Sequence, residues 1–141
     1  MIENKCYIFD TSAFIALTNE EQGCDTVLSL ISLSRSKKNT IYASFITFTE
    51  IYYIILRRKG EKPAKETIAF IRTLPIEQVH SNEQLALSAG KIKAAFRLSL
   101  ADAFVAATAL EKKAILVHKD PEFEVLSKDI QMMPLPYKHA N

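Results

Sequence analysis

The sequence predicts an α/β fold with a mainly parallel central sheet. Short β-rich runs alternate with segments of helical apolar spacing along the whole chain, which is the pattern of strands joined by crossover helices. No internal repeat or linker interrupts this alternation. The chain has 3 glycines, and neither GxGxxG nor GxxxxGKS/T occurs in it. A dinucleotide site or a phosphate-binding loop is therefore not expected.

Two strands and three helices are expected in the first half of the chain. KCYIFD is typical of a short buried strand that ends at Asp10, and FIALTNE after it is typical of a helix. Apolar residues recur at near-helical spacing over 21–36, and the β-rich run TIYAS covers 40–44. TEIYYIILRRKG then predicts a helix, which Gly60 ends.

The second half continues the alternation. Pro63 suits the first turn of a helix, and IEQV after Pro75 predicts a brief strand. A helix of roughly four turns is expected between Ser81 and Arg97, followed by an alanine-rich helix over LADAFVAATALEKK. AILVH is the clearest strand, HKDPEF is the loop that leaves it, and IQMMP predicts a last edge strand.

The composition is that of a globular protein, and residues 1–141 are expected to form one domain. The chain is 48% hydrophobic and 24% charged, with a net charge of +2. That charge is too small to predict nucleic-acid binding by itself. Charged residues interrupt the N-terminus where a signal peptide would be apolar, and no apolar run approaches the roughly 20 residues that span a bilayer. A cytoplasmic protein is expected.

Four carboxylates stand where predicted strands end or helices begin. Asp10 follows the first strand, and Glu50 begins the helix after the second. Asp102 begins the alanine-rich helix, and Asp120 follows AILVH. Because the carboxyl ends of parallel strands meet at one edge of a sheet, these four acids are expected to share a pocket.

Such a cluster predicts a divalent cation. Neighbouring carboxylates raise one another's pKa, and burial raises it further. Mg²⁺ or Mn²⁺ reverses this penalty, because both ions prefer carboxylate and water oxygens. An ion held in this way polarises a phosphodiester and activates water. The four acids therefore predict metal-dependent hydrolysis of a phosphodiester.

Each acid also has a possible capping role. Thr47 and Glu50 form the pattern T-x-x-E, and Ser99 and Asp102 form S-x-x-D. Asp10 stands where a helix begins, and the fourth acid precedes a proline that suits a turn. Capping and metal binding are compatible, because a helix start positions a carboxylate near the strand edge in either case.

Four motifs, in order, resemble those of the PIN-domain ribonucleases, in particular the VapC-type toxin of VapBC toxin–antitoxin pairs. YIFDTSAFIAL resembles the first, a strand followed by an aspartate, a hydroxyl residue and an apolar helix. FTEIYYIILRR resembles the second, and LSLADAFVAATAL, the most specific match, resembles the third. AILVHKDPEF resembles the fourth, a strand followed by Asp-x-x-Phe.

The resemblance implies a three-layer α/β/α sandwich with an acidic Mg²⁺ or Mn²⁺ pocket. It also implies an endoribonuclease toxin that forms a homodimer and is neutralised by an antitoxin peptide. By motif position, Asp10 and Asp102 are the main metal ligands, Glu50 completes the cluster, and Asp120 is a weaker or water-mediated contributor. Ser12 lies where the family often has a small hydroxyl residue near the metal.

The fourth motif departs from the family pattern. His118 stands where the family usually has Thr or Ser, and Lys119 replaces the common glycine. An imidazole is larger than a hydroxyl and titrates near neutrality. We expect His118 to be a packing or solvent-exposed residue and assign it no catalytic role.

Two surfaces are predicted for partners. The helices after Asp10 and Glu50 carry more apolar side chains than one core face needs. Taken singly, each of these side chains is expected to pack in the core, but the surplus across neighbouring helices also suits a homodimer interface or a groove for an antitoxin helix. These side chains are Phe14, Phe48, Tyr52, Tyr53 and Ile55. Phosphates of RNA would meet basic residues around the acidic centre, namely Arg57, Arg58, Lys112, Lys113 and Lys119.

Two other functions fit parts of the pattern. An aspartyl-phosphate phosphatase also places an aspartate after a strand, but it usually needs a second acid two residues later, where this chain has Ser12. A PIN scaffold without catalysis would act as an RNA- or protein-binding module. The presence of all four acids weakens that alternative.

Overall fold

Five parallel strands form one sheet in residues 4–138, the part of the chain that the computed structural model describes. Their order across the sheet is β3-β2-β1-β4-β5. The strands are β1 (Lys5–Phe9), β2 (Asn39–Ser44), β3 (Ile76–Val79), β4 (Ile115–His118) and β5 (Met132–Pro134). β1 is central, with Tyr7 in register with Ile41 of β2 and with Ile115 of β4.

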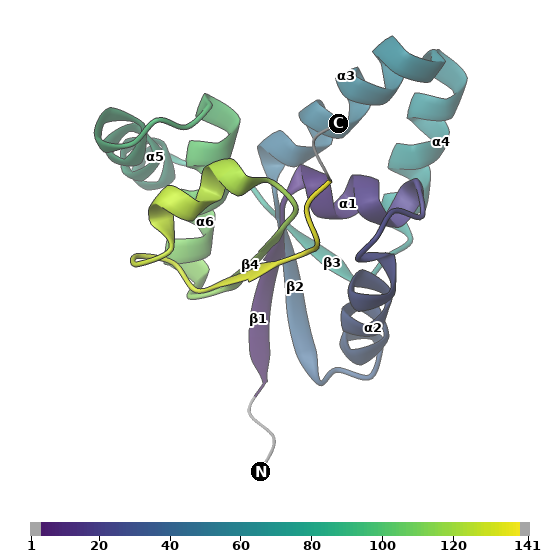
Figure 1. The fold of residues 1–141 in the computed structure, drawn as a ribbon, viewed down its shortest axis with the longest axis horizontal. Coiled ribbons are helices and arrows are strands. Elements are labelled where there is room, and N and C mark those ends of the chain that lie inside the picture. The colour runs from purple at the N-terminus through teal and green to yellow at the C-terminus, as the bar shows by residue number, and fades with distance from the viewer. Residues whose placement is uncertain (1–3, 139–141) are drawn as a thin grey trace.

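Helical connections join successive strands, because parallel strands require crossovers (Figure 1). The helices are α1 (Thr11–Thr18), α2 (Cys24–Arg35), α3 (Phe45–Lys59), α4 (Glu61–Arg72), α5 (Glu83–Ala95) and α6 (Leu100–Lys112). A 3₁₀ helix, η1 (Pro121–Leu126), connects β4 to β5.

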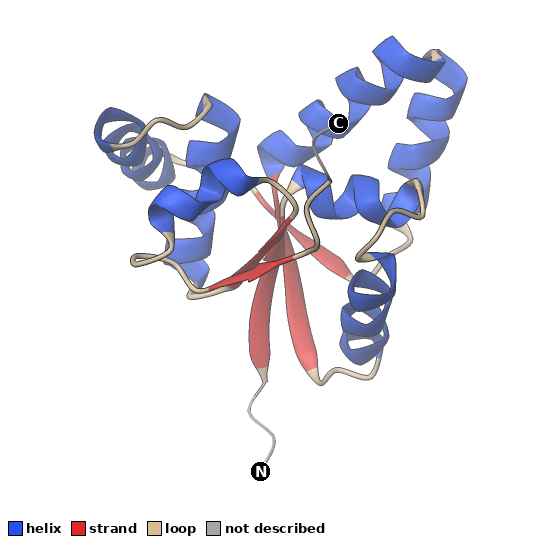
Figure 2. Ribbon diagram, in the orientation of Figure 1, coloured by secondary structure: helices blue, strands red, loops and turns tan. Residues whose placement is uncertain are grey.

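The sheet lies between two layers of helices, which confirms the predicted three-layer α/β/α fold (Figure 2). The alternation of β1 explains the two layers. Tyr7 and Phe9 pack in one core with α1 to α4, whereas Ile8 packs in the other core with α5 and α6. Phe14, which the sequence suggested for a partner surface, is 1% exposed and belongs to the first core.

The elements lie close to their expected positions, although several begin at a different residue. α3 begins at Phe45, earlier than Glu50. Asn82, one residue after the expected Ser81, caps α5 by accepting a hydrogen bond from the Leu85 N–H at 2.8 Å. The segment after β4 is not a plain loop, because Pro121 starts η1.

Gly60 reverses the chain direction between α3 and α4. Its φ of 95° is a backbone conformation that other residues rarely adopt, and it lies between the end of α3 and the start of α4. The two helices pack together as a hairpin that projects from the sheet (Figure 1). Within the described residues, we find no helix with the length and apolarity needed to cross a bilayer.

Candidate active site

Asp10 both caps α1 and faces the carboxyl edge of the sheet. Its Oδ2 accepts hydrogen bonds from the Ser12 backbone N–H at 3.0 Å and from the Ser12 hydroxyl at 2.6 Å. The side chain is buried, and Oδ1 has no hydrogen-bond partner among the described residues. A buried carboxylate oxygen without a donor is costly, so this atom suits a cation.

Glu50 reaches the same edge from α3. It lies in the second turn of that helix and not at its start, because Ser44 is the N-cap and its Oγ accepts from the Ile46 N–H at 3.4 Å. The predicted T-x-x-E capping box is therefore wrong, and Thr47 is a buried residue of the first turn. Glu50 is oriented by Thr11, whose hydroxyl donates to its Oε1 at 2.7 Å.

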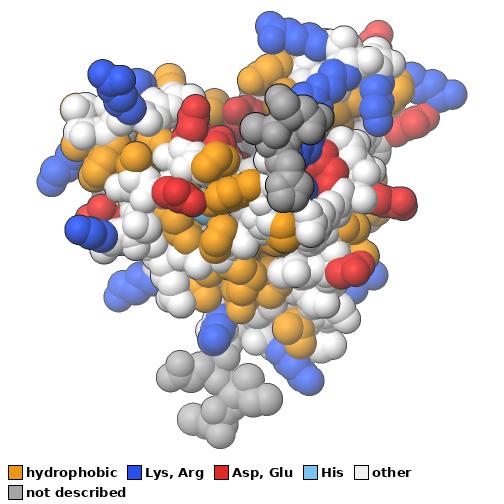
Figure 3. Space-filling model, in the orientation of Figure 1, with side chains coloured by type: hydrophobic (Ala, Val, Ile, Leu, Met, Phe, Trp, Pro, Cys, Tyr) orange, Lys and Arg blue, Asp and Glu red, His pale blue; other side chains and the backbone are white. Residues whose placement is uncertain are grey.

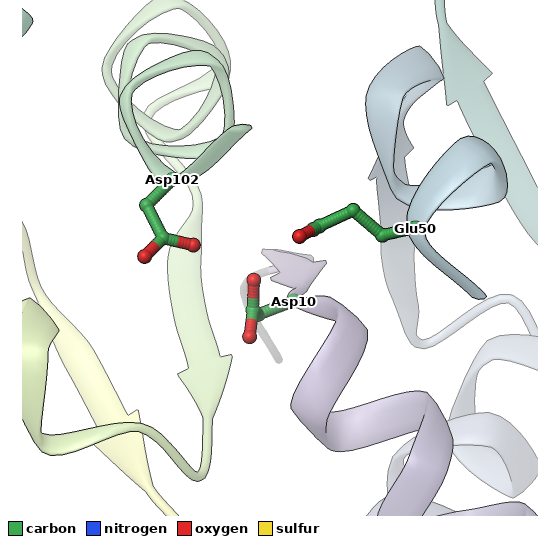
Figure 4. Close-up of side chains that lie close together, drawn as sticks. All are labelled: Asp10, Glu50 and Asp102. Carbon is green, nitrogen blue, oxygen red and sulfur yellow. The ribbon is translucent and has the colours of Figure 1, made fainter. Parts of the chain in front are cut away.

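Asp102 comes from the opposite layer of helices. Ser99 caps α6, and its hydroxyl accepts from the Asp102 backbone N–H at 3.1 Å, as the S-x-x-D pattern predicted. This cap uses the backbone N–H of Asp102, and the carboxylate points toward Asp10 and Glu50 (Figure 4). The side chain is buried with a relative exposure of 7%.

These three acids converge although they are far apart in the sequence. One carboxylate oxygen from each of Asp10, Glu50 and Asp102 lies within 4.8 Å of the other two. Figure 4 shows the three side chains pointing toward one another from the start of α1, from α3 and from α6. The structure therefore brings together three of the four acids that were expected to share a site. The carboxyl edge of the sheet brings them together, because β1, β2 and β4 run parallel there.

Asp120 joins the cluster through Asp102. A second group of carboxylates, within 4.8 Å of one another, consists of Asp102, Asp120 and Glu122. Asp120 also caps η1, because its Oδ1 accepts from the Glu122 N–H at 3.0 Å. Glu122 was not among the predicted site residues. The only sequence feature that pointed to Glu122 was its position two residues after Asp120. That position brings the two carboxylates together only because the chain turns into η1 at Pro121.

The cluster raises the pKa of two of its acids. Burial raises the pKa of Asp10 to about 6. The hydrogen bonds from Ser12 lower this pKa, whereas the charge of Glu50 raises it further. Burial also raises the pKa of Asp102 to about 7, and the charges of Asp10, Asp120 and Glu50 add to the increase. The metal-free site thus disfavours its own negative charge, which a bound cation would relieve.

Ser12 links two of the acid-bearing segments. Its hydroxyl donates to Asp10 and accepts from the Lys119 backbone N–H at 2.8 Å. The Lys119 ammonium is occupied elsewhere, donating to the Gln22 carbonyl at 2.8 Å and lying 3.4 Å from Glu21 Oε1, with a side-chain exposure of 5%. The prediction that Lys119 contacts phosphates is therefore wrong. Ser12 orients Asp10 and ties it to the segment that carries Asp120.

We expect Ser12→Ala to lower the free energy of unfolding by about 1–3 kcal/mol, because it removes a hydrogen bond to a buried carboxylate and the acceptor of a backbone N–H. Chemical denaturation of the metal-free protein measures the loss. Ser32→Ala is the matched control, since Ser32 is exposed on α2. Equal stability of Ser12→Ala and the parent chain would contradict the linking role of this hydroxyl.

His118 is a packing residue, one of the two roles expected for it. Its ring is fully buried and lies against Phe123, with ring centroids 5.1 Å apart. Nδ1 accepts a hydrogen bond from the Asp120 backbone N–H at 3.1 Å. Burial lowers the pKa of the imidazole, because desolvation disfavours its charged form. His118 therefore holds the start of the segment that carries Asp120.

Comparisons with known proteins agree with this fold. The family model described as PIN domain matches residues 7–129. No curated protein sequence matches the chain significantly. Among solved structures, VapBC2 from Rickettsia felis bound to a promoter DNA fragment is 17% identical, with 93% of this chain and 99% of that chain covered and a TM-score of 0.76.

Two further solved structures are similar over almost their whole length. DNA-bound VapBC from Salmonella typhimurium is 17% identical, with 94% of this chain and 98% of that chain covered and a TM-score of 0.72. VapC20 from Mycobacterium tuberculosis, described as a toxin that cleaves the sarcin-ricin loop, is 20% identical, with coverages of 88% and 95% and a TM-score of 0.69. At these identities the likeness shows a shared fold.

Proposed function

Because the chain belongs to the PIN domain family, a family of nucleases, we propose that it is a metal-dependent endoribonuclease and the toxin of a type II toxin–antitoxin system. One observation carries the nuclease proposal. Three carboxylates from α1, α3 and α6 lie within 4.8 Å of one another at the carboxyl edge of the sheet. Acids placed so close repel one another, and a divalent cation with oxygen ligands removes that repulsion.

Asp10, Glu50 and Asp102 would hold Mg²⁺ or Mn²⁺. The unpartnered Oδ1 of Asp10 fits this role, since carboxylate oxygens are the ligands that these ions prefer. Thr11 and Ser12 keep two of the carboxylates in place by donating hydrogen bonds to Glu50 and Asp10. Supporting hydrogen bonds of this kind orient metal ligands and raise metal affinity.

The chemistry proposed is hydrolysis of an RNA phosphodiester. When bound, the cation supplies Lewis-acid polarisation of the phosphodiester and activation of water. Asp120 and Glu122 lie beside Asp102 and would orient the attacking water or accept its proton. In this arrangement Asp10, Glu50 and Asp102 hold the ion, whereas Asp120 contributes more weakly, as an outer ligand or through water.

Basic side chains near the site would position the RNA backbone. Arg57, Arg58 and Lys59 occupy the last turn of α3, and Figure 3 shows Lys and Arg side chains around the α3–α4 hairpin. The Arg57 guanidinium lies 5.1 Å from the centroid of the Tyr53 ring. Contacts of such residues with phosphates position a substrate without reading its sequence.

A groove at the C-terminal end of α1 suits an antitoxin helix. Its volume is about 380 Å³, and it lies between α1 and the α3–α4 hairpin, where Leu17, Ile55 and Phe70 supply apolar walls. Grooves of this kind receive the apolar face of an amphipathic helix. The similar structures from Rickettsia felis and Salmonella typhimurium are VapBC toxin–antitoxin complexes. An antitoxin peptide is therefore a proposed partner of this chain. We also propose that the chain forms a homodimer and acts in the cytoplasm.

The nuclease proposal is tested by incubating the purified protein with total cellular RNA in Mg²⁺ or Mn²⁺, with and without EDTA, and mapping the new RNA ends. We expect discrete cleavage that stops on chelation, because the acids alone supply no Lewis acid. Cleavage that continues in EDTA would contradict the metal mechanism. RNA binding without any cleavage would support the alternative of a non-catalytic PIN module.

A further inference from the structure

A second pocket opens beside the acidic cluster, on the side of β4 and the segment after β5. Its volume is about 300 Å³, near the lower end for ligand pockets. Its walls include Ser12, Ile15, Arg58, Asp120, Pro121 and Tyr137. Ser12 is hydrogen-bonded to Asp10, and Asp120 lies within 4.8 Å of Asp102, so the pocket adjoins the proposed metal ligands directly.

Tyr137 forms an aromatic wall of the pocket, and hydrogen bonds of its backbone segment and of its hydroxyl hold it in place. The segment that carries it is held by the Leu135 backbone N–H, which donates to the His118 carbonyl at 2.7 Å. The Tyr137 hydroxyl donates to Glu124 Oε1 at 3.0 Å, and its ring lies against His118 with ring centroids 6.1 Å apart. An aromatic ring ordered in advance loses little further freedom when a ligand stacks on it.

His118 gives this wall a support that a hydroxyl residue would not provide. The buried imidazole lies beside the Tyr137 ring, tilted by 33° from it, and accepts a hydrogen bond from the Asp120 N–H. Thr or Ser at position 118 would present no ring to Tyr137. His118, which replaces the usual hydroxyl residue of the fourth motif, thus lies between the Tyr137 ring and the segment that carries Asp120.

Arg58 provides the pocket's available cation. Lys119 and Lys138, which also line the pocket, both lie within ion-pair distance of Glu21, at 3.4 Å and 3.0 Å. Within residues 4–138, Arg58 forms no such ion pair, and its side chain is exposed at the end of α3. A guanidinium can bind two oxygens of one phosphate at once.

We propose that this pocket receives a nucleobase of single-stranded RNA, stacked on Tyr137, with Arg58 holding an adjoining phosphate. The site would place one base next to the phosphodiester at the acidic cluster. An aromatic wall suits a base of any sequence, because every base offers a π face. This inference rests on the proposed function and adds to it a subsite that positions the substrate.

Binding of two fluorescein-labelled RNA hexamers tests the proposal. One probe is a normal hexamer, chosen as the tightest binder of rA6, rC6 and rU6, and the other is an abasic hexamer with the same charge. Ca²⁺ replaces Mg²⁺, because it takes the same oxygen ligands, and a gel verifies that the RNA stays intact. We expect the parent chain to bind the normal hexamer about tenfold more tightly than the abasic one.

The variants separate the two contacts. Tyr137→Leu should remove most of the difference in affinity between the two hexamers, and Tyr137→Phe should keep it. Leu87→Ala, which alters an exposed apolar residue of α5 outside the pocket, should leave the difference unchanged. Arg58→Gln should weaken the binding of both hexamers by about the same factor, since it removes a phosphate contact. Because Arg58 is exposed, this variant is expected to fold even if Tyr137→Leu does not.

The outcomes distinguish this proposal from the proposed function. If the parent chain cleaves RNA but binds both hexamers equally, or if Tyr137→Leu keeps the difference in affinity, the base pocket is wrong and the nuclease remains. Unchanged binding in Arg58→Gln would refute the phosphate contact. If the parent chain neither binds the hexamers nor cleaves RNA, both the pocket and the proposed function are wrong.

Discussion

Asp10→Asn and Asp102→Asn are each expected to lower metal-dependent RNA cleavage by at least about a hundredfold. Both residues contribute an oxygen to the same cluster, and both are buried. Loss of an outer partner of a metal ligand already costs about 10–100-fold in affinity or activity, so loss of a ligand charge should cost more. Initial rates of RNA cleavage at saturating Mg²⁺ or Mn²⁺ measure the effect.

Two controls show whether the loss arises at the metal site. Asp129→Asn makes the same chemical change at an exposed residue and should leave the rate unchanged. Calorimetric titration with Mn²⁺ should show weaker binding for both cluster variants, which a purely structural role would not produce. If either variant retains full activity, the assignment of that residue as a metal ligand is wrong.

Metal-free Asp102→Asn is expected to be more stable than the parent chain at pH 8, by up to about 3 kcal/mol, since each tenfold change in an acid dissociation constant corresponds to about 1.4 kcal/mol. The pKa of Asp102 is raised to about 7, so its negative charge destabilises the folded state. Asparagine removes the charge, although burying its amide without full hydrogen bonding reduces the gain in folding free energy. The helix cap survives, because Ser99 accepts the backbone N–H of residue 102.

The stability difference should depend on pH in a defined direction. The folded-state pKa lies above the unfolded value of 3.8, so between these values the folded parent chain binds more protons than the unfolded one. The stabilisation from protonated Asp102 is complete below about pH 4 and is lost as pH rises to about 7. Asp10, with a pKa of about 6, adds a loss of the same sign. The advantage of the variant should therefore vanish near pH 4.

Thermal unfolding in EDTA, followed by circular dichroism from pH 4 to pH 8, measures this dependence. Excess Mg²⁺ should raise the melting temperature of the parent chain at pH 8 and raise that of Asp102→Asn much less, because ligand binding to the folded state stabilises it. A clearly lower melting temperature for metal-free Asp102→Asn at pH 8 would mean that the side chain has a structural role greater than its electrostatic cost.

The acids were recognisable in the sequence because each stands at a strand end or near a helix start, and these positions also place a carboxylate at the edge of the sheet where the cluster forms. Asp10 follows a buried strand and caps the next helix, and the structure shows that it does so while reaching the cluster. Asp102 stood alone among apolar residues, which correctly indicated burial. Glu50 was identified for the wrong local reason, because the residue that caps α3 is Ser44.

Other features of the site left no local signal. Thr11 orients Glu50 across 39 positions of sequence, a contact that exists only because α1 and α3 pack side by side. Lys119 looked like a phosphate contact, but the fold brings Gln22 and Glu21 to its ammonium. Glu122 joins the cluster because η1 turns it back toward Asp102.

The sequence by itself determined the alternation of strands and helices and the placement of acids at strand ends, because periodicity, capping and turn chemistry act over a few residues. Tertiary structure alone decided which acids meet, which side chains hold them, and which basic side chains are already paired. Those outcomes depend on the strand order β3-β2-β1-β4-β5, which brings distant segments to one edge of the sheet. Contacts between such segments follow from packing, and no local pattern encodes them.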